Sequence, residues 1–360
     1  MKIKYRDNSS EFTRFHYDKD ENKFVITSSN PEDDSELLYF PVLHLDEDET
    51  YPIANFSYQL FNNEHSTENS IYQVYVDKKR IGWIFPIQAL LSCEHDYSDD
   101  VYFLKYAYVA TVLLLQNLSD RDRIDSPDEF LLQDYVNSNK CILVIDHQNL
   151  SKVEATDISD YMVSFFKYGY EITGNGNSQP LPIVGTKRMK VRPLAKDLRG
   201  NEHINYLFEE QFPSAETPVI RFHLCYQIIE LLISRVFDHK FQTIIGKLSL
   251  NPENLFDLKD DFTKITGEKE RVKCLFEDYS SCDRRDIGPL QAACEKFLTQ
   301  NGKKVNGNYY YDLYSVRCLL VHKLYSIKKE SYQQLDDINR PFLNIVIDMV
   351  LSFHMPDSPA

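Results

Sequence analysis

The first hundred residues alternate short apolar stretches with polar turns, a pattern typical of antiparallel strands. Five stretches have this form: KIKYR, FTRFHY, KFVIT, IYQVYV and RIGWIF. The last two flank Asp77, Lys78 and Lys79, which predicts a hairpin. The segment 102–118 is long enough and apolar enough to form a helix that packs on the sheet. The run CILVI over 141–145 predicts a buried strand. The N-terminal part is therefore expected to be mixed and β-rich.

A change of texture marks the middle of the chain. Gly174-Asn-Gly-Asn-Ser178 is followed by prolines and then by basic residues, which predicts a loop or a linker. Beyond residue 218 the apolar residues recur at helical spacing, and helices are expected over 219–245, 255–279, 289–300, 310–325 and 332–353. The pattern predicts an α+β protein with a β-rich module (1–175), a linker (176–217) and a helical bundle (218–360).

The charge is distributed unevenly along the chain. The net charge is -15, and residues 1–150 hold 13 Lys and Arg against 27 Asp and Glu, which accounts for -14 of it. The acidic segments 31–36 and 46–49 are expected to be solvated loops. The remaining residues are nearly neutral, so the acidity does not exclude binding of RNA by the C-terminal part.

The sequence also indicates the cellular compartment in which the protein is expected to act. The polar start MKIKYRDNSS does not have the apolar core of a secretion signal, and no apolar run reaches the ~20 residues of a membrane span. Seven scattered cysteines without a C-x-x-C pair fit reduced thiols in the cytoplasm. We expect no cofactor and no metal.

In the predicted helix over 310–325, one pair of charged or polar residues flanks an apolar stripe formed by Leu313, Val316, Leu320 and Leu324. Arg317 is the only arginine of the chain that is followed five positions later by a histidine, His322. An imidazole can take the proton of a ribose 2'-hydroxyl, and a guanidinium can stabilise the charge that develops on phosphorus. The structural alternative is that Arg317 pairs with a carboxylate while His322 caps the helix.

The helical part resembles a HEPN domain, over roughly residues 218–353. The resemblance rests on a long first helix, a penultimate helix reading Y-x-x-Y-x-x-R-x-x-x-x-H, and a final amphipathic helix; it is greatest to the ApeA-like group of prokaryotic antiviral systems. It implies a metal-independent endoribonuclease of defence or toxin type, with Arg317 and His322 at the site and a 2',3'-cyclic phosphate on the product. Cys318 departs from the family, which often has Asn, Asp or His after the arginine.

The spacing adds a geometric expectation. Five residues at 100° each place Arg317 and His322 about 140° apart around an ideal helix. The resemblance implies that two subunits bring their helices together, so a homodimer is expected. Glu230 lies in the apolar run C-Y-Q-I-I-E-L-L-I and is expected to pair with Arg317 at the site, or alternatively with Arg221 or Arg235.

Several other residue groups have side chains that could bind a ligand or a metal. The basic residues Lys187, Arg188, Lys190 and Arg192 are candidates for contacts with the RNA backbone, or they form a solvated loop. Asp146, after the CILVI strand, is similar to the first acid of metal-dependent PIN and NYN nucleases. Cys93, His95 and Asp96 could hold a metal but are expected to form a loop. The alternative to an enzyme is a non-catalytic HEPN-like scaffold for dimerisation or partner binding, and the N-terminal module is expected to sense a trigger or bind a partner.

Overall fold

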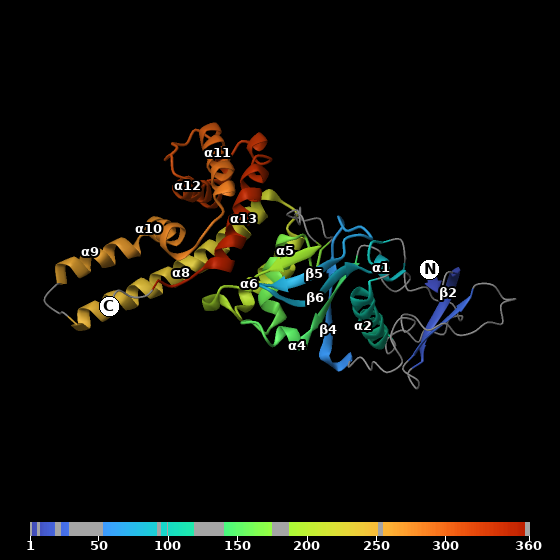
Figure 1. Cartoon of the computed structure of the whole chain (residues 1–360). Helices are drawn as coiled ribbons and strands as arrows, with labels where there is room; N and C mark the ends of the chain where they lie inside the picture. Colours follow the sequence, from blue (N-terminus) through green and yellow to red (C-terminus); the bar gives the residue numbers. More distant parts are fainter. Residues whose placement is uncertain are drawn as a thin grey trace. The chain divides into compact units, whose positions relative to one another are not determined.

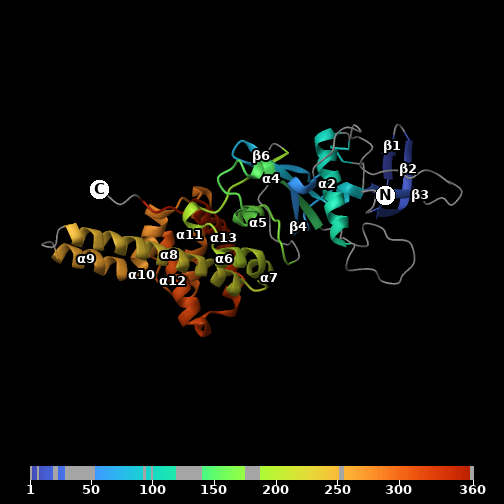
Figure 2. The ribbon, with the colours of Figure 1, turned by 90° about the horizontal axis from the view of Figure 1, so that it is seen from below.

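The computed structural model divides into two compact units (Figures 1 and 2). The sheet unit comprises residues 1–158 and 168–192, and the helical unit comprises 159–167 and 193–360. The structure describes residues 2–5, 8–18, 23–28, 53–91, 95–98, 100–118, 140–174, 187–250 and 255–356. The protein is α+β, as the sequence predicted.

The sheet unit holds two sheets. Its strands are β1 (Lys2–Tyr5), β2 (Asn8–Asp18), β3 (Lys23–Ser28), β4 (Phe56–Asn62), β5 (Tyr72–Val76), β6 (Lys79–Pro86), β7 (Lys140–Asp146) and β8 (Arg188–Val191). The order of the first sheet is β1-β2-β3, and that of the second is β4-β7-β6-β5-β8. Only the pair β5–β8 is parallel, so the second sheet is mixed.

The five stretches predicted as strands and the CILVI strand are confirmed. The hairpin β5–β6 turns at Asp77 and Lys78, and Asp77 has a φ of 53°, which aspartate tolerates better than most residues. β7 is buried on both faces, as its continuous apolar run predicted. β4 and β8 were not predicted from the sequence.

A helix covers one face of the five-stranded sheet. The helices of this unit are α1 (Gln88–Leu91), α2 (Val101–Leu118) and α4 (His147–Leu150), with a short turn at Ile53–Asn55. Trp83 of β6 lies in the core between sheet and helix, with ring centroids 5.8 Å from Phe103 and 6.0 Å from Tyr106 of α2. The helix predicted over 102–118 is therefore confirmed, together with its packing.

The helical unit contains α5 (Met162–Lys167), α6 (Glu202–Tyr206), α7 (Phe212–Ser214), α8 (Pro218–Leu250), α9 (Leu255–Thr266), α10 (Glu268–Cys274), α11 (Arg284–Gln300), α12 (Tyr309–His322) and α13 (Leu335–Ser352). Shorter helical turns lie at Ile158–Tyr161, Lys196–Leu198, Leu207–Gln211, Leu275–Tyr279, Leu324–Ser326 and Lys329–Ser331. α13 packs on α8 and α11, and α12 packs on α11 and α10. The long helix α8 runs beside α9 (Figures 1 and 2).

Several helix boundaries differ from those predicted from the sequence. The single helix predicted over 255–279 is interrupted at Gly267, whose extended backbone ends α9 and begins α10. α11 begins at Arg284, before the predicted start at Pro289, because the Asp283 carboxylate accepts a hydrogen bond from the Arg285 N–H and caps the helix. Residues 187–217, within the segment interpreted as a linker, hold β8 and several short helices.

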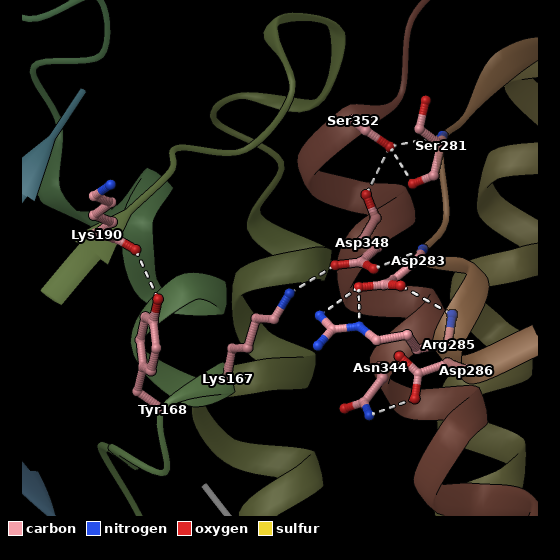
Figure 3. Close-up of polar contacts among 10 residues, drawn as sticks. All are labelled: Lys167, Tyr168, Lys190, Ser281, Asp283, Arg285, Asp286, Asn344, Asp348 and Ser352. Atoms are coloured by element: carbon pink, nitrogen blue, oxygen red, sulfur yellow. Dashed lines mark hydrogen bonds and ion pairs between the residues drawn. The ribbon is translucent and has the colours of Figure 1, made fainter. Parts of the chain in front are cut away.

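Polar contacts tie α5 to the end of the bundle (Figure 3). Lys167 donates to Asp348 of α13 at 2.7 Å, and the other oxygen of Asp348 accepts from the backbone N–H of Asp283. Hydrogen bonds from Arg285 lower the pKa of Asp283 to about 2. The segment 159–167 is therefore bound within the helical unit by a helix far along the chain.

The described helices include none with the length and apolar character that a membrane span requires. The six cysteines that the structure describes are all free thiols, and Cys93 lies outside the described residues. The acidic segments 31–36 and 46–49 and residues 175–178 of the glycine-containing loop also lie outside them.

Candidate functional site

The helix α12 carries both residues of the predicted pair. Its N-terminus is fixed by Asn308, which accepts a hydrogen bond from the Tyr310 N–H, and by the buried carboxylate of Asp312. Leu313, Val316 and Leu320 form its buried stripe, as predicted. Leu324, the fourth member of the predicted stripe, is exposed instead, because α12 ends at His322. The core on one side of α12 thus fixes the direction in which Arg317 leaves the helix.

Arg317 crosses from α12 to α8. Its Nη2 lies 2.7 Å from Oε1 of Glu230, and this hydrogen bond is the pairing that the sequence predicted. The same nitrogen lies 3.9 Å from Oε1 of Glu268 on α10. The Arg317 side chain is 18% exposed and that of Glu230 is 46% exposed, so the pair opens to solvent on the side of the carboxylate.

The ring of Tyr226 forms the floor of this site. Cζ of Arg317 lies 5.3 Å from the ring centroid, a distance at which the cation and the aromatic face attract each other. The Tyr226 hydroxyl donates to Glu268 at 3.4 Å. Burial, and then the charge of Glu268, raise the pKa of Tyr226, so the phenol keeps its proton. The guanidinium is held between an aromatic face and two carboxylates.

The surroundings hold Arg317 as a permanent cation. Burial acts to lower its pKa, but the hydrogen bond with Glu230 and the charge of Glu268 outweigh burial, and the pKa is raised. Its Nε is buried and has no hydrogen-bond partner in the described part of the chain. A buried donor without an acceptor is uncommon in folded proteins.

His322 lies elsewhere on the helix. It is the last residue of α12 and is exposed, about 140° from Arg317 around the helix axis by the ideal helical angle. Three large apolar residues beside it are also exposed: Val321 (46%), Leu324 (39%) and Tyr325 (89%). The structure therefore places Arg317 and His322 on one helix but not on one face of it.

A second imidazole near Arg317 was missed from the sequence. His223 is half-buried on α8, one turn before Tyr226 and two turns before Glu230. Burial lowers its pKa; the charge of Glu230 raises it, and the charge of Arg317 lowers it. The spacing of these three polar side chains along one face of an apolar helix was the pattern that could have revealed the site.

Besides Glu268, the residues Tyr314 and Cys318 lie close to Tyr226 and Arg317. Burial, and then a hydrogen bond with the Cys318 thiol, raise the pKa of Tyr314 to about 12. The Cys318 thiol is thus in contact with an aromatic hydroxyl. Both residues lie on α12, so this contact does not reach beyond the helix.

The basic residues belong to the sheet unit. Arg188 and Lys190 are exposed on β8, the edge strand of the five-stranded sheet. Lys187 lies 3.2 Å from Asp96 and donates to the Asn69 carbonyl oxygen, while Arg188 lies over the Tyr75 ring. Arg192 is close enough for its charge to lower the pKa of Tyr168, which burial raises. Charged side chains on an edge strand also prevent pairing with other chains.

The rival sites have structural explanations. The Asp146 carboxylate caps α4 by accepting from the backbone of Gln148 and Asn149, and it also accepts from the Asn149 side chain. β7 pairs antiparallel with both of its neighbours, which does not provide the parallel strand ends that a PIN-like site uses. His95 is buried and contacts the Ala89 carbonyl oxygen.

Within the described ranges, no group of three or more His, Cys, Asp or Glu residues is placed to hold a metal ion. Comparison with models of known protein families gave no match, and neither a curated protein nor a solved structure matched the chain. The arrangement of Arg317, Glu230, Tyr226 and Glu268 is therefore the observation from which a function must be argued.

Proposed function

We propose that the helical unit is a metal-independent endoribonuclease of HEPN type that acts in antiviral defence or as a toxin. The observation that carries the proposal is the position of Arg317, held as a cation on the Tyr226 ring beside the half-exposed Glu230. A guanidinium at a solvent-open edge can bind a phosphate oxygen with two N–H groups and stabilise the charge that develops on phosphorus.

Cleavage of RNA by this route requires a base, an acid and a cation, which Arg317 and the histidine His322 can provide without a metal. A base takes the proton of the ribose 2'-hydroxyl, whose oxygen attacks phosphorus and leaves a 2',3'-cyclic phosphate, and an acid protonates the departing 5'-oxygen. Arg317 stabilises the transition state, and His322 is the general acid or base. Phosphate entry requires Arg317 to exchange part of its contact with Glu230 for the substrate, so Glu230 positions the guanidinium in the free protein.

The proposal includes a homodimer, because Arg317 and His322 leave one helix in different directions. The exposed residues Val321, Leu324 and Tyr325 next to His322 provide an apolar surface for a second copy. Two α12 helices that meet there would bring His322 of each copy toward the other. The sheet unit would then sense the trigger or bind a partner, its basic edge β8 would contact the RNA backbone, and the protein would act in the cytoplasm.

The first test removes the pair. Expressed in a bacterial host, the wild-type chain should slow growth and fragment RNA, whereas Arg317→Ala/His322→Ala should do neither, with cleavage reduced at least ~100-fold. The matched control is Arg284→Ala/His354→Ala, which removes an exposed arginine and an exposed histidine from the same unit. EDTA should leave cleavage by purified protein unchanged, and the new ends should carry cyclic phosphates. Equal behaviour of the wild type and the first double variant would contradict the proposal.

The second test addresses the dimer. Tyr325→Glu places a charge in the apolar surface and should raise the dimer dissociation constant at least ~10-fold, since burial of an aromatic side chain contributes about 1.5–3 kcal/mol. Light scattering after size-exclusion chromatography measures the mass. Tyr206→Glu, at another exposed tyrosine of the helical unit, is the control. A wild-type chain that stays monomeric at high concentration would contradict this part.

A non-catalytic scaffold is the second candidate. It is favoured by one observation, the carboxylate partner that Arg317 already has in Glu230. Both hypotheses predict that Glu230→Gln lowers stability, because it weakens the ion pair with Arg317. A scaffold predicts no other effect, whereas an enzyme predicts that the variant also cleaves RNA at an altered rate.

A further inference from the structure

Within one protomer, the imidazole that can act together with Arg317 is that of His223 on α8, and not that of His322. His223, Tyr226 and Glu230 succeed one another on one face of α8 at intervals of one turn. The guanidinium of Arg317 lies over the middle member, Tyr226, and hydrogen-bonds to Glu230 on the next turn. A residue three positions before Tyr226 is displaced by only ~4.5 Å along the helix axis. His223 and Glu230 therefore lie about one turn to either side of Tyr226 along α8.

The ring of His223 is available for chemistry. It is half-buried, and its imidazole makes no hydrogen bond with another residue of the described ranges. The ring of Phe222 lies beside it, with centroids 6.3 Å apart, and a neighbour of this kind limits its motion without occupying its nitrogens. The charged groups that act on the imidazole are Glu230 on its own helix and Arg317 on α12. Glu268 of α10 reaches Arg317 and Tyr226 from the third helix of the site.

We propose that His223 is the general base of the ribonuclease and accepts the 2'-hydroxyl proton of a ribose whose phosphate is bound by Arg317 of the same protomer. The 2'-oxygen then forms its bond to phosphorus, and the bond between phosphorus and the 5'-oxygen breaks. The departing oxygen takes its proton from His322, contributed by the second copy. One imidazole begins neutral and the other begins protonated, so the two exchange states in each turnover and no proton is lost or gained.

The environment of the two imidazoles fits this division of labour. Burial and the nearby guanidinium lower the pKa of His223, and the attraction of Glu230 only partly offsets them, so the ring is neutral at neutral pH, as a base must be. His322 is the exposed last residue of α12, so a second copy of the chain can reach it.

This inference rests on the proposed function, and the experiment separates the two. The full-length chain is tested on a fluorophore-labelled single-stranded RNA of mixed sequence under single-turnover conditions, across a series of pH values. His223→Asn, which keeps a polar side chain of similar shape, should lower the rate ~100-fold or more at neutral pH. The wild-type rate should rise with pH through an inflection below 6.5, and this inflection should vanish in the variant.

A second variant and a control keep the test decisive. His223→Ala should recover part of its rate when free imidazole is added, which a purely structural residue would not do. His203→Ala, at a histidine on α6 of the same unit, should keep the wild-type rate and profile. Melting temperatures verify that the His223 variants are folded.

The outcomes are distinct. Loss of the inflection together with imidazole rescue supports the inference. If His223→Asn cleaves RNA at the wild-type rate while Arg317→Ala/His322→Ala does not, His223 is not the general base. The inference about His223 then fails, and the proposed ribonuclease function stands. If the wild type leaves the RNA intact, the proposed function and this inference fail together.

Discussion

Replacement of Gly82 by alanine should lower the free energy of unfolding of the sheet unit by about 3 kcal/mol or more. A Cβ at this position of β6 would lie 2.1 Å from the carbonyl oxygen of Val144 on β7. Because the obstructing atom belongs to the backbone of a strand that is buried on both faces, no side chain can move aside. The sheet would have to separate between β6, its central strand, and β7.

The single tryptophan of the chain makes this effect measurable. Trp83 follows Gly82 directly, is fully buried against α2, and therefore reports on the sheet unit when fluorescence is followed in denaturant. The control is Gly246→Ala in α8, where an added Cβ meets no atom within 4 Å and should stabilise its helix by up to ~1 kcal/mol. A Gly82→Ala protein with the wild-type midpoint would show that β6 and β7 do not approach as described.

Asp312→Ala should lower the free energy of unfolding of the helical unit by about 3–4 kcal/mol. The Asp312 side chain is fully buried, and its carboxylate accepts hydrogen bonds from the backbone N–H groups of Asn306 and Gly307 and from the Asn306 side chain. Hydrogen bonds to a charged acceptor contribute about 1.5–3 kcal/mol each, and the alanine variant leaves two backbone donors without a partner.

Far-UV circular dichroism in denaturant measures the effect, because the helical unit contributes most of the helix. Asp336→Ala, at an exposed acid in the first turn of α13, is the matched control and should change stability by less than ~1 kcal/mol. Since Asp312 fixes the start of α12, its loss should also reduce RNA cleavage through Arg317. An unchanged unfolding midpoint would mean that the loop before α12 is not held by this carboxylate.

Much of the fold could be predicted because the pattern of apolar residues within one segment is enough to determine many of its helices and strands. CILVI had to be a strand buried on both faces, and the apolar stripe of α12 had to face the core. β8 could not be found, because its four residues read as a basic run, and only pairing with β5 makes them a strand. Gly267 interrupts a helix that the apolar pattern alone continues.

The site was predicted only in part for a similar reason. The Arg317–Glu230 pair was expected, since an ionised carboxylate in an apolar helix needs a partner. Glu268 could not be assigned, because it lies 38 residues after Glu230 by number and reaches the site only through the packing of α10. His223 was overlooked because a single histidine is informative only once its neighbours in space are known.

Residues 159–167 belong to the helical unit, which affects how the chain can fold during its synthesis. Lys167 leaves the ribosome 181 residues before its partner Asp348, and at ~5–20 residues per second this delay is roughly 10–35 s. Throughout that interval Phe165 and Phe166 of α5 have no completed bundle to enter, although both end up buried. Nascent chains should therefore need chaperone protection at this point, and a fragment that begins at Pro193 should aggregate for lack of α5.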